Sequence, residues 1–312
     1  MNTAPSLSPR ATACGKVIVA GEHSVVYGYP ALAAAIPSSL ELAATRTEPG
    51  QPVQLRIPAW DIDVVLRPDT DHPVARAAME VIGFCDGPLT GWAIEGTTTL
   101  PSRAGLGSSA ALTVALARLC LGQDADLATV VDASLAGERV FHGEPSGIDS
   151  EVAARGGLLR YVKGAQVEAI PLRHPLSLVV VPSGKPRSTA DQVAKVRARL
   201  DRFPKVIRPV LDALGALVDR SIAAIQSNDL DHLGELFNIA HPLLSGLDVS
   251  SWILDELCDT ARSCGARGAK LTGAGGGGCI LCLPQDDPAA LCEALQGRGH
   301  APVRIDLLPF ES

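Results

Sequence analysis

Short apolar runs, separated by glycine and proline, alternate with longer helical patterns along this chain. In the first half the apolar runs predict strands at 13–20, 92–100 and 158–162, and two more within 53–66 on either side of Pro58-Ala-Trp60. Helices are predicted at 72–84, 110–121 and 147–154, and from 127 to about 140. Asp126 stands directly before the helix that begins at 127, where its carboxylate can cap the first turn.

The second half is richer in helical patterns. A strand at 176–181, apolar except for Ser177, is followed by helical patterns over 189–244 and 251–264, then by a strand at 279–283, a helix at 288–296 and a strand at 303–308. The change of pattern near 165–175 predicts a domain boundary, with an N-terminal domain over 1–170 and a C-terminal domain over 171–312. One segment is ambiguous: the alanine content of 31–36 predicts a helix, whereas 40–47 alternates like a strand.

Composition limits the classes of protein that this chain can represent. Its 312 residues, 46% hydrophobic and 20% charged, are typical of a globular protein of one large or two medium domains. The net charge of −7 argues against nucleic acid or an anionic membrane as the main partner. No apolar run approaches the roughly 18 residues of a membrane span, and the first ten residues lack a secretion signal, so we expect a cytoplasmic protein.

The eight cysteines do not predict a metal or redox site. Only Cys279 and Cys282 have the C-x-x-C spacing, without a second pair or a nearby histidine. We expect small, reduced thiols, most of them buried.

Two glycine-rich segments are candidates for ligand-binding loops. In the first, 101–110 (PSRAGLGSSA), two glycines let the backbone approach an anion, and two serines open an apolar helix whose N-terminus favours negative charge. A plain glycine turn with a serine N-cap would have the same sequence pattern. The second, 270–279 (KLTGAGGGGC), places four consecutive glycines in an apolar frame, unlike the polar composition usual in flexible surface loops.

A third segment, 138–149 (ERVFHGEPSGID), supplies carboxylates. Phosphoryl transfer needs a base for the acceptor hydroxyl, cations around the γ-phosphate and a metal that bridges the phosphates. Asp149 could be the base, Lys16 the cation, and Glu138 with a loop serine the metal ligands. Taken singly, each has an ordinary structural explanation: Asp149 as a helix cap, Glu138 as a solvated side chain, Lys16 as an edge residue. Their occurrence together favours a kinase.

These segments, together with 15–28 (GKVIVAGEHSVVYG) and Gly137, resemble the GHMP kinases, and most closely the mevalonate kinases. Gly-Glu-His at 21–23 combined with Pro-Ser-Gly-x-Asp at 145–149 distinguishes the mevalonate kinases from galactokinases and phosphomevalonate kinases. The resemblance implies an α+β, two-domain GHMP kinase fold with a ribosomal-protein-S5-like N-terminal domain and a ferredoxin-like C-terminal domain. It also implies an active site in the cleft between the domains, and it places 31–47 largely in a strand.

The resemblance implies ATP-dependent phosphorylation of the C5 hydroxyl of mevalonate, giving 5-phosphomevalonate for isoprenoid precursor synthesis. Asp149 would be the catalytic base, paired with Lys16, and Glu138 would bind Mg²⁺ together with Ser109 or Ser108, of which we favour Ser109. Residues implied in ATP and phosphate binding are Pro101, Gly105, Leu106, Gly107, Ser108, Ser109 and Ala110. Residues implied in substrate binding are Glu22, His23, Arg187, Thr189, Gly273, Ala274, Gly275 and Gly276, with Arg187 facing the substrate carboxylate.

The implied partners are therefore mevalonate and ATP, with Mg²⁺ as the metal, no nucleic acid and no membrane; a homodimer is left open. A kinase for another small alcohol and a mevalonate-derived decarboxylase stay open as well. A non-catalytic sensor on the same fold would be expected to have lost Lys16, Glu138 or Asp149, and all three are present. A dinucleotide-binding oxidoreductase is disfavoured, because 101–103 separate the predicted strand from the glycines. No G-x-x-x-x-G-K-[S/T] motif occurs, which disfavours a Walker-type ATPase.

Overall fold

A computed structural model of the chain describes residues 7–100, 105–186 and 188–309. Within these ranges the chain forms two compact units, each built from separate stretches of sequence. The first unit contains 7–16, 37–100 and 106–156, and the second contains 17–36, 105, 157–186 and 188–309. Strands β1 (Arg10–Ala20) and β2 (Ala31–Arg46) therefore each contribute to both units. The domain boundary expected near 165–175 stays a prediction.

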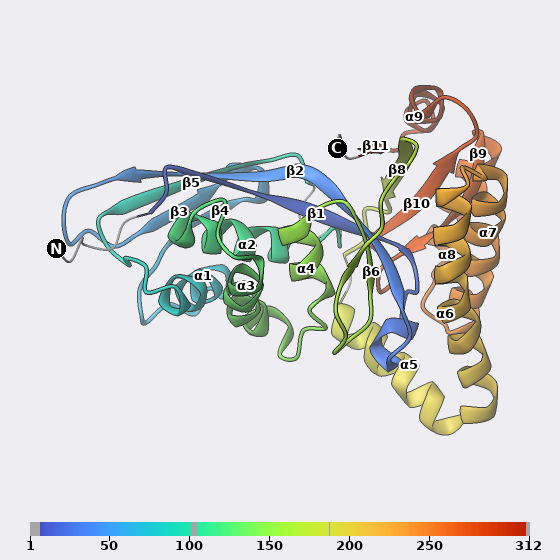
Figure 1. Ribbon diagram of the computed structural model, residues 1–312, viewed down its shortest axis with the longest axis horizontal. Coiled ribbons are helices and arrows are strands. Elements are labelled where there is room, and N and C mark those ends of the chain that lie inside the picture. Colours follow the sequence, from blue (N-terminus) through green and yellow to red (C-terminus); the bar gives the residue numbers. More distant parts are fainter. Residues whose placement is uncertain (1–6, 101–104, 187, 310–312) are drawn as a thin grey trace. The chain divides into compact units, whose positions relative to one another are not determined.

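The first unit joins a twisted sheet to four helices. Strand β5 (Trp92–Thr98) pairs antiparallel with the second half of β2 and parallel with β3 (Gln54–Ile57), and β4 (Ile62–Val65) pairs antiparallel with β3. Four helices lie on one side of this sheet (Figure 1): α1 (Pro73–Phe84), α2 (Ser108–Leu121), α3 (Leu127–His142) and α4 (Ile148–Arg155). Helix α2 is the central one, because every residue from Ala110 to Leu119 is buried.

The second unit contains a four-stranded antiparallel sheet. The strand order is β11 (Val303–Leu307), β8 (Leu176–Pro182), β10 (Cys279–Pro284) and β9 (Ala266–Thr272), and every residue of β10 is buried. Helices α7 (Leu230–Gly246) and α8 (Trp252–Ser263) pack on it, and α5 (Thr189–Arg202), α6 (Pro204–Gln226) and α9 (Pro288–Gln296) complete the unit. Strand β6 (Leu158–Tyr161) pairs with β7 (Glu168–Ala169) and with the first half of β2. A short 3-10 helix covers Ser24–Tyr27.

Most of the elements expected from the sequence are confirmed, including the Asp126 cap, whose carboxylate accepts a hydrogen bond from Thr129 N at 3.0 Å. The helix suggested by the alanine content of 31–36 is wrong. These residues form a strand that is buried and paired with β6, as the resemblance implied, and this tertiary context outweighs the weak helical preference of alanine. Strand β9 was not expected. Among the described residues, no helix has the length and apolar character that crossing a membrane requires.

Candidate active site

The first unit brings Lys16 and Asp149 together. The Lys16 side chain on β1 is 7% exposed, and its Nζ lies 3.1 Å from Oδ1 of Asp149, whose side chain is 31% exposed. Asp149 stands in the first turn of α4, two residues after Gly147, which caps the helix at a φ of +89° that favours glycine. The result is a carboxylate that is held by a buried cation and remains partly accessible to a substrate.

The glycine-serine loop lies against the same lysine. Lys16 N donates to Leu106 O at 2.8 Å, and a Cβ added at Gly107 (φ +76°) would lie 2.8 Å from Lys16 Cγ, so glycine allows this close approach. Helix α2 begins at Ser108 with no side-chain cap and no acidic residue in its first turn. The first N–H groups of an α-helix have no partner within the helix, and they can therefore bind an anion here. The Oγ of Ser108 is buried and has no hydrogen-bond partner among the described residues.

Glu138 on α3 completes this cluster. Its side chain is 3% exposed, and burial, followed by the negative charge of Asp149, raises the pKa of this carboxyl to about 8. A hydrogen bond with Ser109 and the charge of Lys16 act in the opposite direction. His142, one turn later, has Nε2 at 3.8 Å from Glu138 Oε2 and 3.4 Å from Ser109 Oγ. Glu138 Oε1 is buried with no partner in the described part of the chain.

These oxygens fit a magnesium ion. Within the described ranges no group of three or more His, Cys, Asp or Glu side chains could hold a metal by itself. Mg²⁺, however, is usually bound by one or two carboxylates, with waters and substrate phosphates filling its other positions. The unpartnered Oε1 of Glu138 and the loop serines supply hard oxygen donors of this kind. The Mg²⁺ ligands stay a prediction.

The second unit contains the other predicted polar residues. Glu22 and His23 follow β1 directly and are both buried. His23 has a φ of +61°, and its Nε2 lies 2.9 Å from Ala274 O. The carboxylate of Glu22 accepts a hydrogen bond from Nζ of Lys270, and neither side chain is exposed. The segment after β1 is thus joined by two polar contacts to the second glycine-rich segment.

The glycine run at 273–278 is packed against neighbouring backbone. Gly276 N donates to Val249 O at 2.7 Å, and Gly278 N donates to Lys185 O at 3.0 Å. A Cβ at Gly275 would lie 2.0 Å from Val249 O, a separation that no side chain can adopt. This segment is therefore a fitted loop that requires glycine.

The remaining residues that the sequence predicted for the site differ in their exposure. Thr189 is the exposed first residue of α5, while Leu106 and Ala110 are buried beside the loop. Pro101 and Arg187 lie outside the described residues. The first unit gathers Lys16, Leu106, Gly107, Ser108, Ser109, Ala110, Glu138 and Asp149, and the second gathers Glu22, His23, Gly273, Ala274, Gly275 and Gly276.

Sequence reasoning assigned no role to two residues in these clusters. Lys270 was noted only as the start of the glycine-rich segment, although a lysine inside an apolar frame is an unusual feature that could have identified it. His142 stands four residues after Glu138, and this helical spacing places both side chains on one face.

Comparisons with known proteins identify the family of the chain. Residues 73–157 match the family model for the GHMP kinases N terminal domain, and residues 221–301 match the model for GHMP kinases C terminal. The mevalonate kinase of Pyrococcus horikoshii is 36% identical over 319 residues, which cover 94% of this chain and 93% of that protein. The chain belongs to the mevalonate kinase family of GHMP kinases. A more distant member of this family, from Mus musculus, is 31% identical over 340 residues, covering 87% of this chain and 85% of its own.

Solved structures of this mevalonate kinase family share the fold. The crystal structure of L. major mevalonate kinase in complex with R-mevalonate has a TM-score of 0.86 at 28% identity and covers 99% of both chains. The Methanococcus jannaschii mevalonate kinase, at 22% identity and a TM-score of 0.82, supports the fold alone. The GHMP kinase family and the α+β fold expected from the motifs are thus confirmed.

Proposed function

We propose that this chain transfers the γ-phosphoryl group of ATP to the C5 hydroxyl of mevalonate, giving 5-phosphomevalonate. Similarity to curated mevalonate kinases along nearly the whole chain, and to a structure that holds R-mevalonate, supports this activity. The observation that carries it within this molecule is the 3.1 Å ion pair of Lys16 and Asp149 beside a glycine-serine loop that opens a helix.

Asp149 acts as the base in this proposal. As the hydroxyl oxygen of the substrate bonds to the γ-phosphorus, its proton passes to the Asp149 carboxylate and ADP leaves. Protonation removes the negative charge that Lys16 faces in the resting pair. The ammonium group, already desolvated and in place, is then free to stabilise the phosphoryl oxygens.

The phosphates lie along the start of α2, at the N–H groups of the turn formed by Gly107, Ser108 and Ser109. Glu138 and Ser109 would hold Mg²⁺, with Ser108 as the alternative hydroxyl. We favour Ser109 because its Oγ and Oε2 of Glu138 both lie near Nε2 of His142, at 3.4 Å and 3.8 Å. When bound, the metal supplies charge neutralisation for the phosphate oxygens.

Glu22, His23 and the glycine loop at 273–276 form the acceptor side, with Thr189 and Arg187 as further contacts. A carboxylate such as Glu22 accepts hydrogen bonds and therefore suits a substrate hydroxyl, while an arginine suits the substrate carboxylate. The adenine site, a cytoplasmic location, a homodimer and an active site in a cleft between the domains stay predictions.

Coupled measurement of ADP release tests the acceptor. Mevalonate, phosphomevalonate, galactose and homoserine are compared at saturating ATP, each with Mg²⁺ and with EDTA. We expect turnover with mevalonate and Mg²⁺ alone. Equal turnover of galactose or homoserine would reject mevalonate as the substrate and favour a GHMP-type kinase for another small alcohol.

A further inference from the structure

Lys270 is a charged residue in the interior of the second unit. It stands on β9 with no exposed surface, and its Nζ donates to Glu22 Oε1 and also lies 3.3 Å from the carbonyl oxygens of Ile18 and Leu271. The ring of Phe237 on α7 faces the same ammonium group at 5.4 Å. All the polar contacts of Lys270 are thus made inside the protein, and none requires solvent.

Burying such a pair has no obvious value for stability. Removing two charges from water is unfavourable, and their mutual attraction offsets this penalty only in part, so apolar residues of similar volume often serve a core equally well. Lys270 and Glu22 lie on segments 248 residues apart in sequence. We therefore looked for the role of this buried pair in the segments that Glu22 and Lys270 contact.

Both members adjoin the segments assigned to the acceptor substrate. Glu22 precedes His23, whose ring contacts Ala274 O in the glycine loop. Two residues after Lys270, the Thr272 hydroxyl donates to Ile18 O at 2.9 Å and accepts from Ile18 N at 3.0 Å, which fixes β9 against β1 just before the glycine run. The ion pair therefore connects the start of one binding segment with the start of the other.

We propose that Lys270 is a positioning residue for the acceptor site: its ammonium group fixes the orientation of the Glu22 carboxylate, which then accepts a hydrogen bond from a hydroxyl of the substrate. This inference rests on the proposed function, in which Glu22 binds the acceptor. An ionised carboxylate only accepts hydrogen bonds, whereas a protonated one also donates. Without Lys270 the Glu22 carboxylate loses the contact that orients it, and recognition of the substrate hydroxyl weakens.

The other titratable groups near Lys270 have partners or states of their own. His241 on α7 accepts a hydrogen bond from Leu271 N at Nδ1 (3.2 Å), and burial lowers the pKa of its imidazole, so it is neutral. Its Nε2 lies 3.0 Å from Asp255 on α8, which leaves that carboxylate already paired. Burial raises the pKa of the Cys258 thiol to about 12. Glu22 is consequently the carboxylate that Lys270 contacts, and the ring of His23 beside it contacts Ala274 O.

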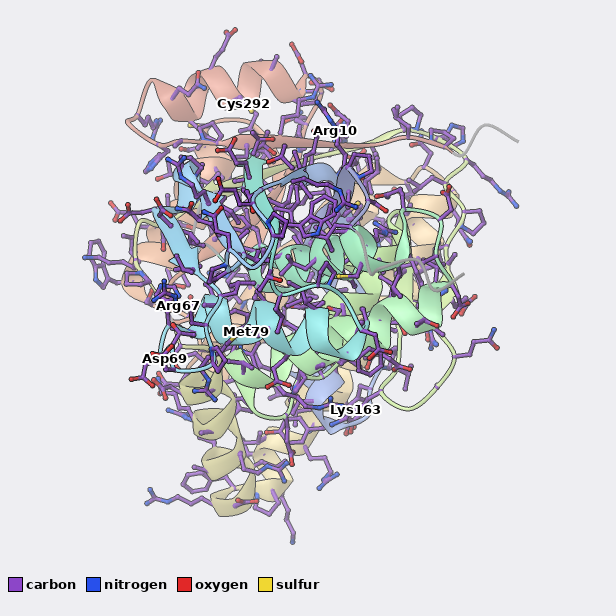
Figure 2. All side chains as sticks on the ribbon, turned by 90° about the vertical axis from the view of Figure 1, so that its left-hand side faces the viewer. Arg10, Arg67, Asp69, Met79, Lys163 and Cys292 are labelled. Carbon is purple, nitrogen blue, oxygen red and sulfur yellow. The ribbon has the colours of Figure 1, made fainter. Side chains whose placement is uncertain are left out.

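Four variants test the inference: Lys270→Met, Glu22→Gln, the double variant and Lys270→Arg. Lys163→Met serves as the matched control, because Lys163 is an exposed lysine of the same unit (Figure 2). Melting temperatures identify the folded variants, and kcat and KM for mevalonate and for ATP are then measured from pH 6 to pH 9. Lys163→Met should match the unmodified chain in every measurement.

For Lys270→Met we expect kcat/KM for mevalonate to fall by roughly 100-fold at pH 7, with the KM for ATP within about threefold. In the Glu22→Gln background the lysine change should have little further effect, because the group on which it acts is gone. Lys270→Arg, which keeps the charge, should retain most of the activity.

Equal losses towards ATP and mevalonate in Lys270→Met, or an effect of the same size in the Glu22→Gln background, would overturn the inference. If Lys270→Met alone fails to fold, the double variant, which leaves no uncompensated charge, is compared with Glu22→Gln. Equal KM values for mevalonate in these two variants support the inference, and a further rise in the double variant rejects it. An unmodified chain that does not phosphorylate mevalonate would instead reject the proposed function.

Discussion

Replacing Glu138 by glutamine removes the ionisable proton of a side chain that is 3% exposed on α3 while keeping its size. The raised pKa of this group gives the change a measurable consequence even without substrate. In the folded chain the carboxyl titrates at a pKa of about 8, compared with an ordinary value of 4.5. That difference corresponds to about 5 kcal/mol between the two protonation states, an order-of-magnitude figure for a group that is almost fully buried.

The sign follows from proton binding. Between pH 4.5 and about 8 the folded chain binds more protons at Glu138 than the unfolded chain does. The free energy of unfolding therefore falls as the pH rises through this window, by up to about 5 kcal/mol, and levels off above it. Glutamine does not ionise, so the variant loses this dependence.

Thermal melting in EDTA measures the effect. We expect similar melting temperatures for both proteins near pH 5, and by pH 9 a variant that melts roughly 10 °C higher. A second assay titrates Mg²⁺ into the protein with ATP. Because a carboxyl must lose its proton to bind metal, the apparent affinity of the unmodified chain should rise about tenfold per pH unit below 8. The variant should bind Mg²⁺ more weakly at every pH and without this slope.

Glu144→Gln is the matched control, because Glu144 is an exposed carboxylate of the same segment. If the melting temperature of Glu138→Gln depends on pH in the same way as that of the unmodified chain, the Glu138 carboxyl does not have the raised pKa. If melting changes as expected while the Mg²⁺ titration does not move, Glu138 is buried but is no metal ligand.

Two further substitutions test other parts of the site. Asp149→Asn should lower kcat by roughly 10²- to 10⁴-fold with little change in nucleotide binding, and near-normal turnover would show that the carboxylate only caps α4. Gly276→Val should reduce turnover and the rise in melting temperature on nucleotide addition, and it should lower the melting temperature of the free protein, because valine is strained at a φ of +73° and its Cβ would displace the flexible Gln192 side chain. Gly299→Val is the control, at a φ of +85° but with open space around it; full activity of the Gly276 variant would show that the loop lies away from the ligands.

Local signals predicted most of the elements because they act within a few residues. Asp126 marks the start of α3 through its own carboxylate, and an apolar run interrupted only by Ser177 marks β8. The failures have a different origin. The alanines of 31–35 occur in a strand because neighbouring strands bury them, and β9 has no apolar run because Arg267 and Lys270 interrupt it. Both strands depend on partners that are distant in sequence, which no local pattern contains.

The same distinction applies to the site. Motifs identified nearly all the residues of the two clusters, since a phosphate loop or an acidic segment is a property of consecutive residues. The pairing of Glu22 with Lys270 is a property of topology: it exists because the end of β1 lies beside β9, where Ile18 and Thr272 exchange hydrogen bonds. A buried lysine is tolerated only where such a partner is supplied. Substitution of Glu22 should therefore destabilise the buried position of Lys270. A motif taken alone does not predict this coupling, because the two residues belong to different motifs.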